Sequence, residues 1–161
     1  MKHCIRCLLP AILLIALILS GCNVSKMPFN GDISFHDLSL TIDKRFIRDS
    51  TQSTRDLWIF EHGGYSEYVI LSRQDAPADA TASLEDYAAY LTEEGVEAEL
   101  TEFLGCEAVS SSYTKDGKAC REILFAYSGS LYAIALRGGD EEGFRALTDS
   151  VRIHKGTEEQ S

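Results

Sequence analysis

The chain has 161 residues, of which 45% are hydrophobic and 25% charged, and 25 acidic against 15 basic side chains give it a net charge of −10 at pH 7. This composition suits one globular domain and is too apolar for a disordered chain. The charge argues against a nucleic-acid partner, because phosphate contacts require clustered lysine and arginine.

Residues 1–21 have the pattern of an export signal. Lys2 and Arg6 precede an apolar run, Leu8–Leu19, of twelve residues. The run is shorter than the roughly 20 residues of a membrane-spanning helix and matches the apolar region of a signal peptide. An ordinary secretory peptide and a retained transmembrane anchor are the alternatives.

The apolar run ends in Leu19-Ser20-Gly21-Cys22, which resembles the lipobox of bacterial lipoproteins. In that family the cysteine carries diacylglycerol, with or without a further N-linked acyl chain such as palmitate, and the chain is cut just before it. The resemblance implies a lipid anchor on Cys22 at the extracytoplasmic side of a cell membrane. Because Asn23 follows, it implies the outer membrane if the cell has two membranes. Two acyl chains hold a soluble domain stably at a bilayer.

After the signal we expect a tether over residues 22–31, a folded domain over 32–154 and a polar tail over 155–161. Strand patterns dominate the domain. Alternating apolar and polar residues, or runs of aromatic and β-branched residues, predict strands at 33–36, 38–42, 57–61, 65–73, 96–101, 106–113, 118–127, 131–137 and 151–153.

Polar segments separate these strands. Residues 49–56 are expected to form a loop, and His62-Gly63-Gly64 a hairpin turn. The strand over 96–101 has a charged outer face and is expected at an edge of the sheet.

Two helices are predicted. The first begins at Ser83 as its N-cap and stops at Gly95. Its apolar face follows helical spacing and consists of Leu84, Tyr87, Ala88 and Leu91. The second runs over Glu141–Thr148, with Asp140 as its cap and with Phe144 and Leu147 packing inward.

Two cysteines, Cys106 and Cys120, remain in the expected domain, and an exported compartment permits a disulfide between them. A two-residue turn at Asp116-Gly117 opposes this pairing, because it sets Cys120 opposite Tyr113 and leaves Cys106 near Tyr127. A longer loop or a bulge would shift this register, so the bridge stays open.

The order of elements, with Leu131-Tyr132-Ala133-Ile134 in the last long strand and a short helix and strand over 144–153, resembles the PsbP-like superfamily. That superfamily includes a Ran-binding nuclear-import factor and the bacterial DcrB-like lipoproteins. The resemblance implies an α+β fold, with an antiparallel sheet of about six to seven strands and helices packed on its faces as an α/β/α sandwich. It also implies a role in binding or assembly, and no shared active site.

Motifs for chemistry are scarce. His36, His62 and His154 are isolated, and the chain has neither a nucleophile elbow beside the His62 turn nor a phosphate-binding loop. Acidic pairs such as Asp75 and Asp79 lack the pattern of a calcium loop. We therefore predict no catalytic residue, no metal ligand and no cofactor other than the lipid on Cys22.

The segment between Arg73 and Lys115 contains no basic residue and ten acidic ones. Four of them are our candidate partner-binding residues, because they cluster at the end of the first helix and on the next strand: Glu93, Glu94, Glu97 and Glu99. A solvated face that aids solubility is the simpler interpretation. The alternative is a docking surface for a basic protein.

The charges of the domain are also unevenly distributed. Basic side chains gather instead around the predicted polar loop: Lys44, Arg45, Arg48 and Arg55. We therefore expect an electrical asymmetry across the domain.

These observations favour a membrane-anchored lipoprotein whose domain is a non-enzymatic protein-binding or assembly module. A lipoprotein that binds a small ligand or metal in a pocket between sheet and helix is the alternative. A hydrolase with an unrecognised site is a third, weaker option.

Overall fold

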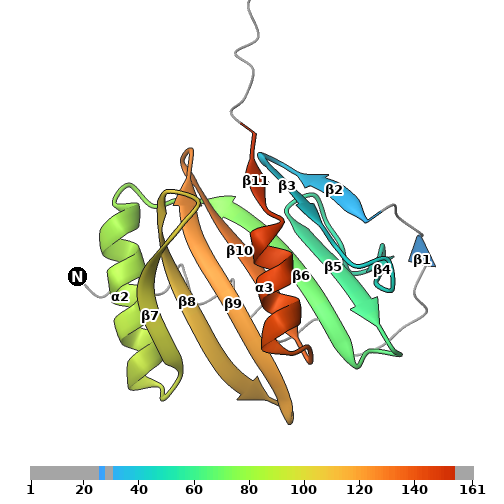
Figure 1. Ribbon diagram of the computed structural model, residues 1–161. Coiled ribbons are helices and arrows are strands. Elements are labelled where there is room, and N and C mark those ends of the chain that lie inside the picture. Colours follow the sequence, from blue (N-terminus) through green and yellow to red (C-terminus); the bar gives the residue numbers. More distant parts are fainter. Residues whose placement is uncertain (1–25, 28–30, 155–161) are drawn as a thin grey trace, which may run out of the picture.

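The computed structural model describes residues 26–27 and 31–154, which form two antiparallel sheets and two helices (Figure 1). The strands of the large sheet, in spatial order, are β1 (Lys26–Met27), β4 (Ile47–Asp49), β5 (Leu57–His62), β6 (Glu67–Asp75), β10 (Ser130–Arg137), β9 (Lys118–Tyr127), β8 (Cys106–Lys115) and β7 (Glu97–Phe103). The small sheet consists of β11 (Arg152–Ile153), β3 (Leu38–Thr41) and β2 (Asp32–Phe35). The helices are α2 (Ala80–Glu93) and α3 (Glu141–Asp149).

The two helices pack on opposite faces of the large sheet. Neighbouring residues of a strand point to opposite faces. On β10, Leu131 and Ala133 belong to the cluster under α2, whereas Ile134 and Leu136 belong to the cluster that contains the small sheet and Leu147 of α3. In Figure 1 α3 lies in front of the large sheet, and α2 is seen beyond β7. The expected α+β sandwich is therefore confirmed.

The main hydrophobic core lies on the α3 side. The small sheet closes this face, and Phe35, Phe60 and Phe125 are at most 1% exposed there. Because α3 packs mainly on β10 and β3, its nine residues do not reach the other edge of the sheet. This incomplete cover is what creates the candidate site.

The first helix begins earlier than predicted. Asp79, not Ser83, is the N-cap, and its carboxylate accepts the backbone N–H of Ala82 at 3.1 Å. The Ser83 side chain is buried and donates a hydrogen bond to the carbonyl of Asp79. Asp79 competes better for the role because its carboxylate accepts a charge-assisted bond at the positive end of the helix. The predicted stop at Gly95, with φ of +78°, is confirmed.

The predicted β8–β9 turn is also confirmed. Lys115 pairs with Lys118, and Asp116 and Gly117 both have positive φ, as a type I′ turn requires. Cys120 therefore pairs with Tyr113. Cys106 and Cys120 are both free thiols, so no disulfide joins them in this structure.

Several strands differ from the prediction. The loop predicted to begin at residue 49 is preceded by β4, which pairs with β5 and with Lys26–Met27 inside the predicted tether. His62 ends β5 rather than lying in the turn. The strands β2 and β3 form a separate small sheet, in which β11 from the end of the chain pairs with β3. Alternation within one strand cannot reveal such a distant partner.

In the described part of the chain, neither helix has the length and apolarity that a membrane-spanning helix requires. The predicted signal segment, Cys22 and the predicted tail lie outside the described residues.

Candidate functional site

A polar groove lies where α3 fails to cover β7, β8 and β9. The registers place Glu97 opposite Ser112, and Ser112 opposite Arg121, so these three residues form one row across the sheet. The row continues to Leu136 of β10, which packs in the core on the α3 side. All four side chains therefore stand on the face that carries α3.

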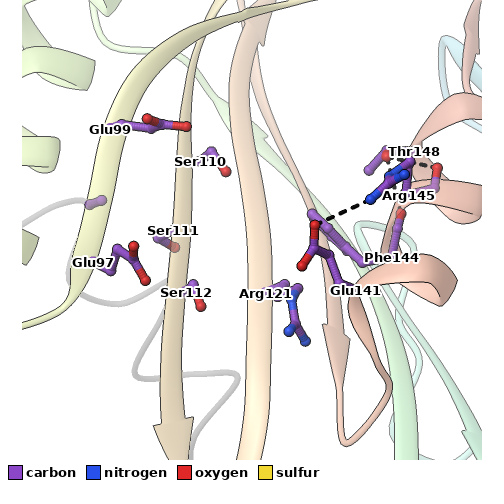
Figure 2. Close-up of a pocket in the computed structure, with 11 residues that line it drawn as sticks. Glu97, Glu99, Ser110, Ser111, Ser112, Arg121, Glu141, Phe144, Arg145 and Thr148 are labelled. Atoms are coloured by element: carbon purple, nitrogen blue, oxygen red, sulfur yellow. Dashed lines mark hydrogen bonds and ion pairs between the residues drawn. The ribbon is translucent and has the colours of Figure 1, made fainter.

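The groove has a volume of about 600 Å³ (Figure 2). Its walls are β7 and α3, and its floor is formed by β8 and β9. The residues that line it are mostly polar and charged: Glu97, Ala98, Glu99, Ser110, Ser111, Ser112, Arg121, Glu141, Phe144, Arg145 and Thr148.

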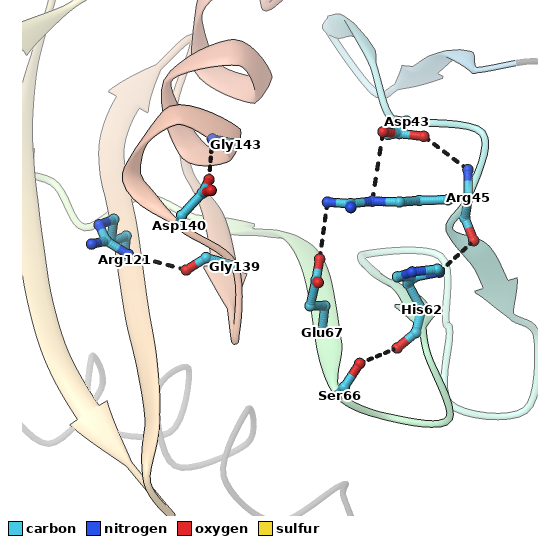
Figure 3. A network of polar contacts seen from close by, with 9 residues as sticks. All are labelled: Asp43, Arg45, His62, Ser66, Glu67, Arg121, Gly139, Asp140 and Gly143. Atoms are coloured by element: carbon cyan, nitrogen blue, oxygen red, sulfur yellow. Dashed lines mark hydrogen bonds and ion pairs between the residues drawn. The ribbon is translucent and has the colours of Figure 1, made fainter.

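Arg121 is fixed at the base of the α3 wall. Its Nη1 donates a hydrogen bond of 3.2 Å to the carbonyl of Gly139, one residue before the N-cap Asp140 of α3 (Figure 3). On the helix itself Glu141 and Arg145 form an ion pair of 3.2 Å, with both side chains largely exposed. This pair engages the one basic side chain of α3, and Glu142 and Asp149 leave the helix with a net negative charge.

The β7 wall carries uncompensated negative charge. Glu97 and Glu99 are exposed, and none of the described residues forms an ion pair with either carboxylate. β7 is also an edge of the sheet, as predicted, and its Leu100 is 53% exposed. Charged residues on an edge strand oppose uncontrolled pairing between chains.

The structure separates the four predicted partner-binding glutamates into two pairs. Glu97 and Glu99 line the groove, whereas Glu93 and Glu94 are exposed at the C-terminal end of α2, which packs on the opposite face. Acidic side chains at a helix C-terminus are unfavourable by about 0.3–1 kcal/mol each. Helix stability therefore gives no reason for Glu93 and Glu94 to be acidic.

Sequence reasoning missed the other residues of the groove. Arg121, Phe144 and Arg145 lie more than twenty residues from Glu99 in the chain, and the β8–β9 pairing and the packing of α3 bring them into the groove. On β8 the run of three consecutive serines, Ser110–Ser112, was the local signal of a polar floor.

The basic residues lie toward the other edge of the large sheet, around β4. Arg45 contacts Asp43 at 3.5 Å and Glu67 at 3.0 Å, and its carbonyl is 3.1 Å from Nδ1 of His62 (Figure 3). The Arg48 guanidinium lies 3.9 Å from the ring centre of Trp58, and burial lowers its pKa. The expected asymmetry is thus present, although part of the positive charge is engaged within the domain.

A second, more apolar cleft of about 410 Å³ separates α3 from the small sheet and the segment that follows it. Phe46, Val69, Leu136 and Leu147 form its inner surface, and Arg45 stands among its polar lining residues. Its volume lies within the range of small-molecule sites.

One buried carboxyl lies on the α2 side of the large sheet. Glu122 is 3% exposed, and burial raises its pKa to about 7. Tyr87 of α2 and Tyr113 of β8 have raised pKa values, first through burial and then through the nearby charge of Glu122. Burial of this kind disfavours the charged form, so a substantial fraction of the Glu122 carboxyl keeps its proton near neutral pH.

The histidines do not assemble a site. Nε2 of His36 lies 3.0 Å from a carboxylate oxygen of Asp56. His62 belongs to a different set of contacts, through its Nδ1 and the carbonyl of Arg45. Within residues 26–27 and 31–154, no group of three or more His, Cys, Asp or Glu side chains is arranged to hold a metal ion.

Comparison with known proteins supports the fold. No protein-family profile and no curated protein matches the chain. The structure is similar to that of the cyanobacterial PsbP protein CyanoP from Synechocystis, with a TM-score of 0.56 and 12% identity over 84% of this chain and 99% of that one. It is also similar to a protein from Bacteroides thetaiotaomicron, with a TM-score of 0.52 and 10% identity over 84% of this chain and half of that one. The described domain therefore has a PsbP-like fold.

Proposed function

We propose that the chain is a bacterial lipoprotein, anchored by acyl chains on Cys22, whose PsbP-like domain docks a protein partner without catalysing a reaction. The observation that carries the docking proposal is the β7 wall of the groove. Glu97 and Glu99 stand there as exposed carboxylates beside a groove large enough to receive side chains of a partner. A basic partner would supply the missing counter-charge.

Electrostatic steering is the physical advantage of such a wall. Uncompensated carboxylates on one edge attract a basic surface before contact, and the attraction falls as salt increases. The basic residues around β4 lie toward the opposite edge, so they do not cancel this field locally. Docking on β7 should therefore be sensitive to ionic strength.

The two pairs of glutamates provide a matched test. Glu97→Gln with Glu99→Gln and Glu93→Gln with Glu94→Gln remove the same charge, the first pair in the groove and the second outside it. In-cell crosslinking and affinity capture of the tagged full-length chain should lose its dominant partner only with the β7 pair. Equal loss with both pairs would indicate a general charge effect and contradict docking in the groove.

The lipid anchor needs a separate measurement. Mass spectrometry of the protein extracted from membranes should show a chain that begins at Cys22 and carries the added mass of acyl chains. Cys22→Ser should release the domain from the membrane fraction. A mature chain that begins elsewhere, or a Cys22 without acyl chains, would contradict the anchor and leave the docking proposal standing.

The apolar cleft favours a second candidate function, the binding of a small ligand. Its inner surface is preformed, and Arg45 offers a polar group among the residues that line it. A small molecule that binds there should raise the melting temperature of the domain. Phe46→Ala should abolish that shift, whereas the β7 glutamine pair should leave it unchanged.

A further inference from the structure

The groove presents both signs of charge on its two sides. Glu97 belongs to one edge strand, and Arg121 lies two strands away in the same row, with Ser112 between them. Two strand spacings correspond to about 10 Å between their backbones. No ion pair joins Arg121 to a carboxylate of the described residues.

The structure keeps these opposite charges apart. Arg121 is directed to the α3 side by its bond with Gly139, and only the short side chain of Ser112 lies between it and β7 (Figure 2). The guanidinium has five N–H donors, of which this bond uses one. The remaining donors can form paired hydrogen bonds with a carboxylate that enters the groove.

A uniformly basic partner does not fit this arrangement. Its second cation would approach Arg121, and two like charges in a partly desolvated groove repel each other. A ligand that carries both signs would satisfy the Glu97 wall and Arg121 together. On α3, Glu141 and Arg145 already pair with each other and so leave Arg121 as the distinctive cation.

We propose that the groove recognises an extended, mixed-charge peptide segment of the partner, with a basic residue on Glu97 and Glu99 and an adjacent acidic residue on Arg121. This inference rests on the proposed docking function and specifies the partner. Successive side chains of an extended chain point in opposite directions. A Lys-Asp neighbour pair that lies along the groove therefore directs one side chain to the β7 wall and the other to the α3 side.

Synthetic peptides with defined charge test this specificity. Fluorescence anisotropy would measure the binding of labelled peptides to the purified full-length chain. One peptide alternates Lys and Asp, a second alternates Lys and Asn, and a third contains Lys alone. We expect the Lys/Asp peptide to bind about tenfold more tightly than the Lys/Asn peptide, as one charge-assisted hydrogen-bonded pair allows. Equal binding of the Lys/Asp and Lys/Asn peptides, tighter binding of the Lys-only peptide, or no binding of any peptide would overturn the inference.

Variants assign the preference to Arg121. Arg121→Gln should reduce the Lys/Asp preference to about unity and keep the weaker binding that depends on lysine, whereas Arg121→Lys should restore part of the preference. Glu97→Gln with Glu99→Gln should weaken both peptides. If cellular capture depends on the β7 pair while Arg121→Gln leaves the peptide ratio unchanged, the docking function stands and the mixed-charge specificity is wrong.

Discussion

Replacing Gly138 by alanine tests the close approach that positions α3. Gly138 has a φ of +82°, and a Cβ added to it would lie 2.1 Å from the carbonyl oxygen of Ser66 in the β5–β6 turn. Gly139, the next residue, supplies the carbonyl that holds Arg121. Because Gly138 has no side chain, the β5–β6 turn can approach the end of β10 closely, next to the residue that holds Arg121 at the α3 wall of the groove.

The expected destabilisation has two parts. The left-handed backbone costs about 1–2 kcal/mol for an alanine. Relief of the overlap with Ser66 adds about 1–3 kcal/mol, as for other overpacked sites. Gly117→Ala is the matched control, because Gly117 has a similar φ of +72° but no atom within 4 Å of an added Cβ. Gly138→Ala should therefore lower the free energy of unfolding by about 1–3 kcal/mol more than Gly117→Ala.

Urea unfolding followed by tryptophan fluorescence measures this difference. Trp58 is the single tryptophan of the chain, and it lies against the Arg48 guanidinium in the folded domain. Its emission should change when the domain unfolds. Equal losses of stability for the two alanine variants would refute the close approach of Gly138 to the β5–β6 turn.

Three further measurements test other parts of the structure. Burial raises the pKa of Glu122 to about 7 from the usual 4.5, so the folded state retains a proton that the unfolded state has released. Stability should then fall as the pH rises from 4.5 to 7, and Glu122→Gln should flatten this dependence in urea unfolding across that range. Asp140→Ala removes the N-cap of α3 and should lower the free energy of unfolding of the domain by about 1 kcal/mol, with a lower melting temperature. Cys106 and Cys120 should both react with a thiol reagent in denaturant without prior reduction, and protection of both would contradict the free thiols.

Local turn chemistry explains the parts of the fold that the sequence could predict. Asp116-Gly117 and Gly95 each favour a positive φ, so the β8–β9 register and the end of α2 followed from a few residues. The start of α2 was harder, because Asp79 and Ser83 both offer an oxygen to the first turn. Asp79 takes the role because its carboxylate accepts a charge-assisted bond at the positive end of the helix, whereas Ser83 is buried within the helix.

The small sheet and the groove depend on distant contacts. Strand β11 reaches β3 across more than a hundred residues, and no pattern within Leu38–Thr41 indicates that partner. The acidity of Glu97 and Glu99 was evident in the sequence. Their separation from Glu93 and Glu94, and their position across from Arg121, follow only from the faces on which α2 and α3 pack.

The most direct test of the docking account is the amount of partner captured by the two glutamine pairs in the same cells. Loss of two ion pairs of about 0.5–1 kcal/mol each should reduce capture about tenfold for Glu97→Gln with Glu99→Gln. Glu93→Gln with Glu94→Gln should retain capture, because these residues lie outside the groove. Retention by both pairs, equal loss by both pairs, or the absence of any specific partner would contradict docking on the β7 wall.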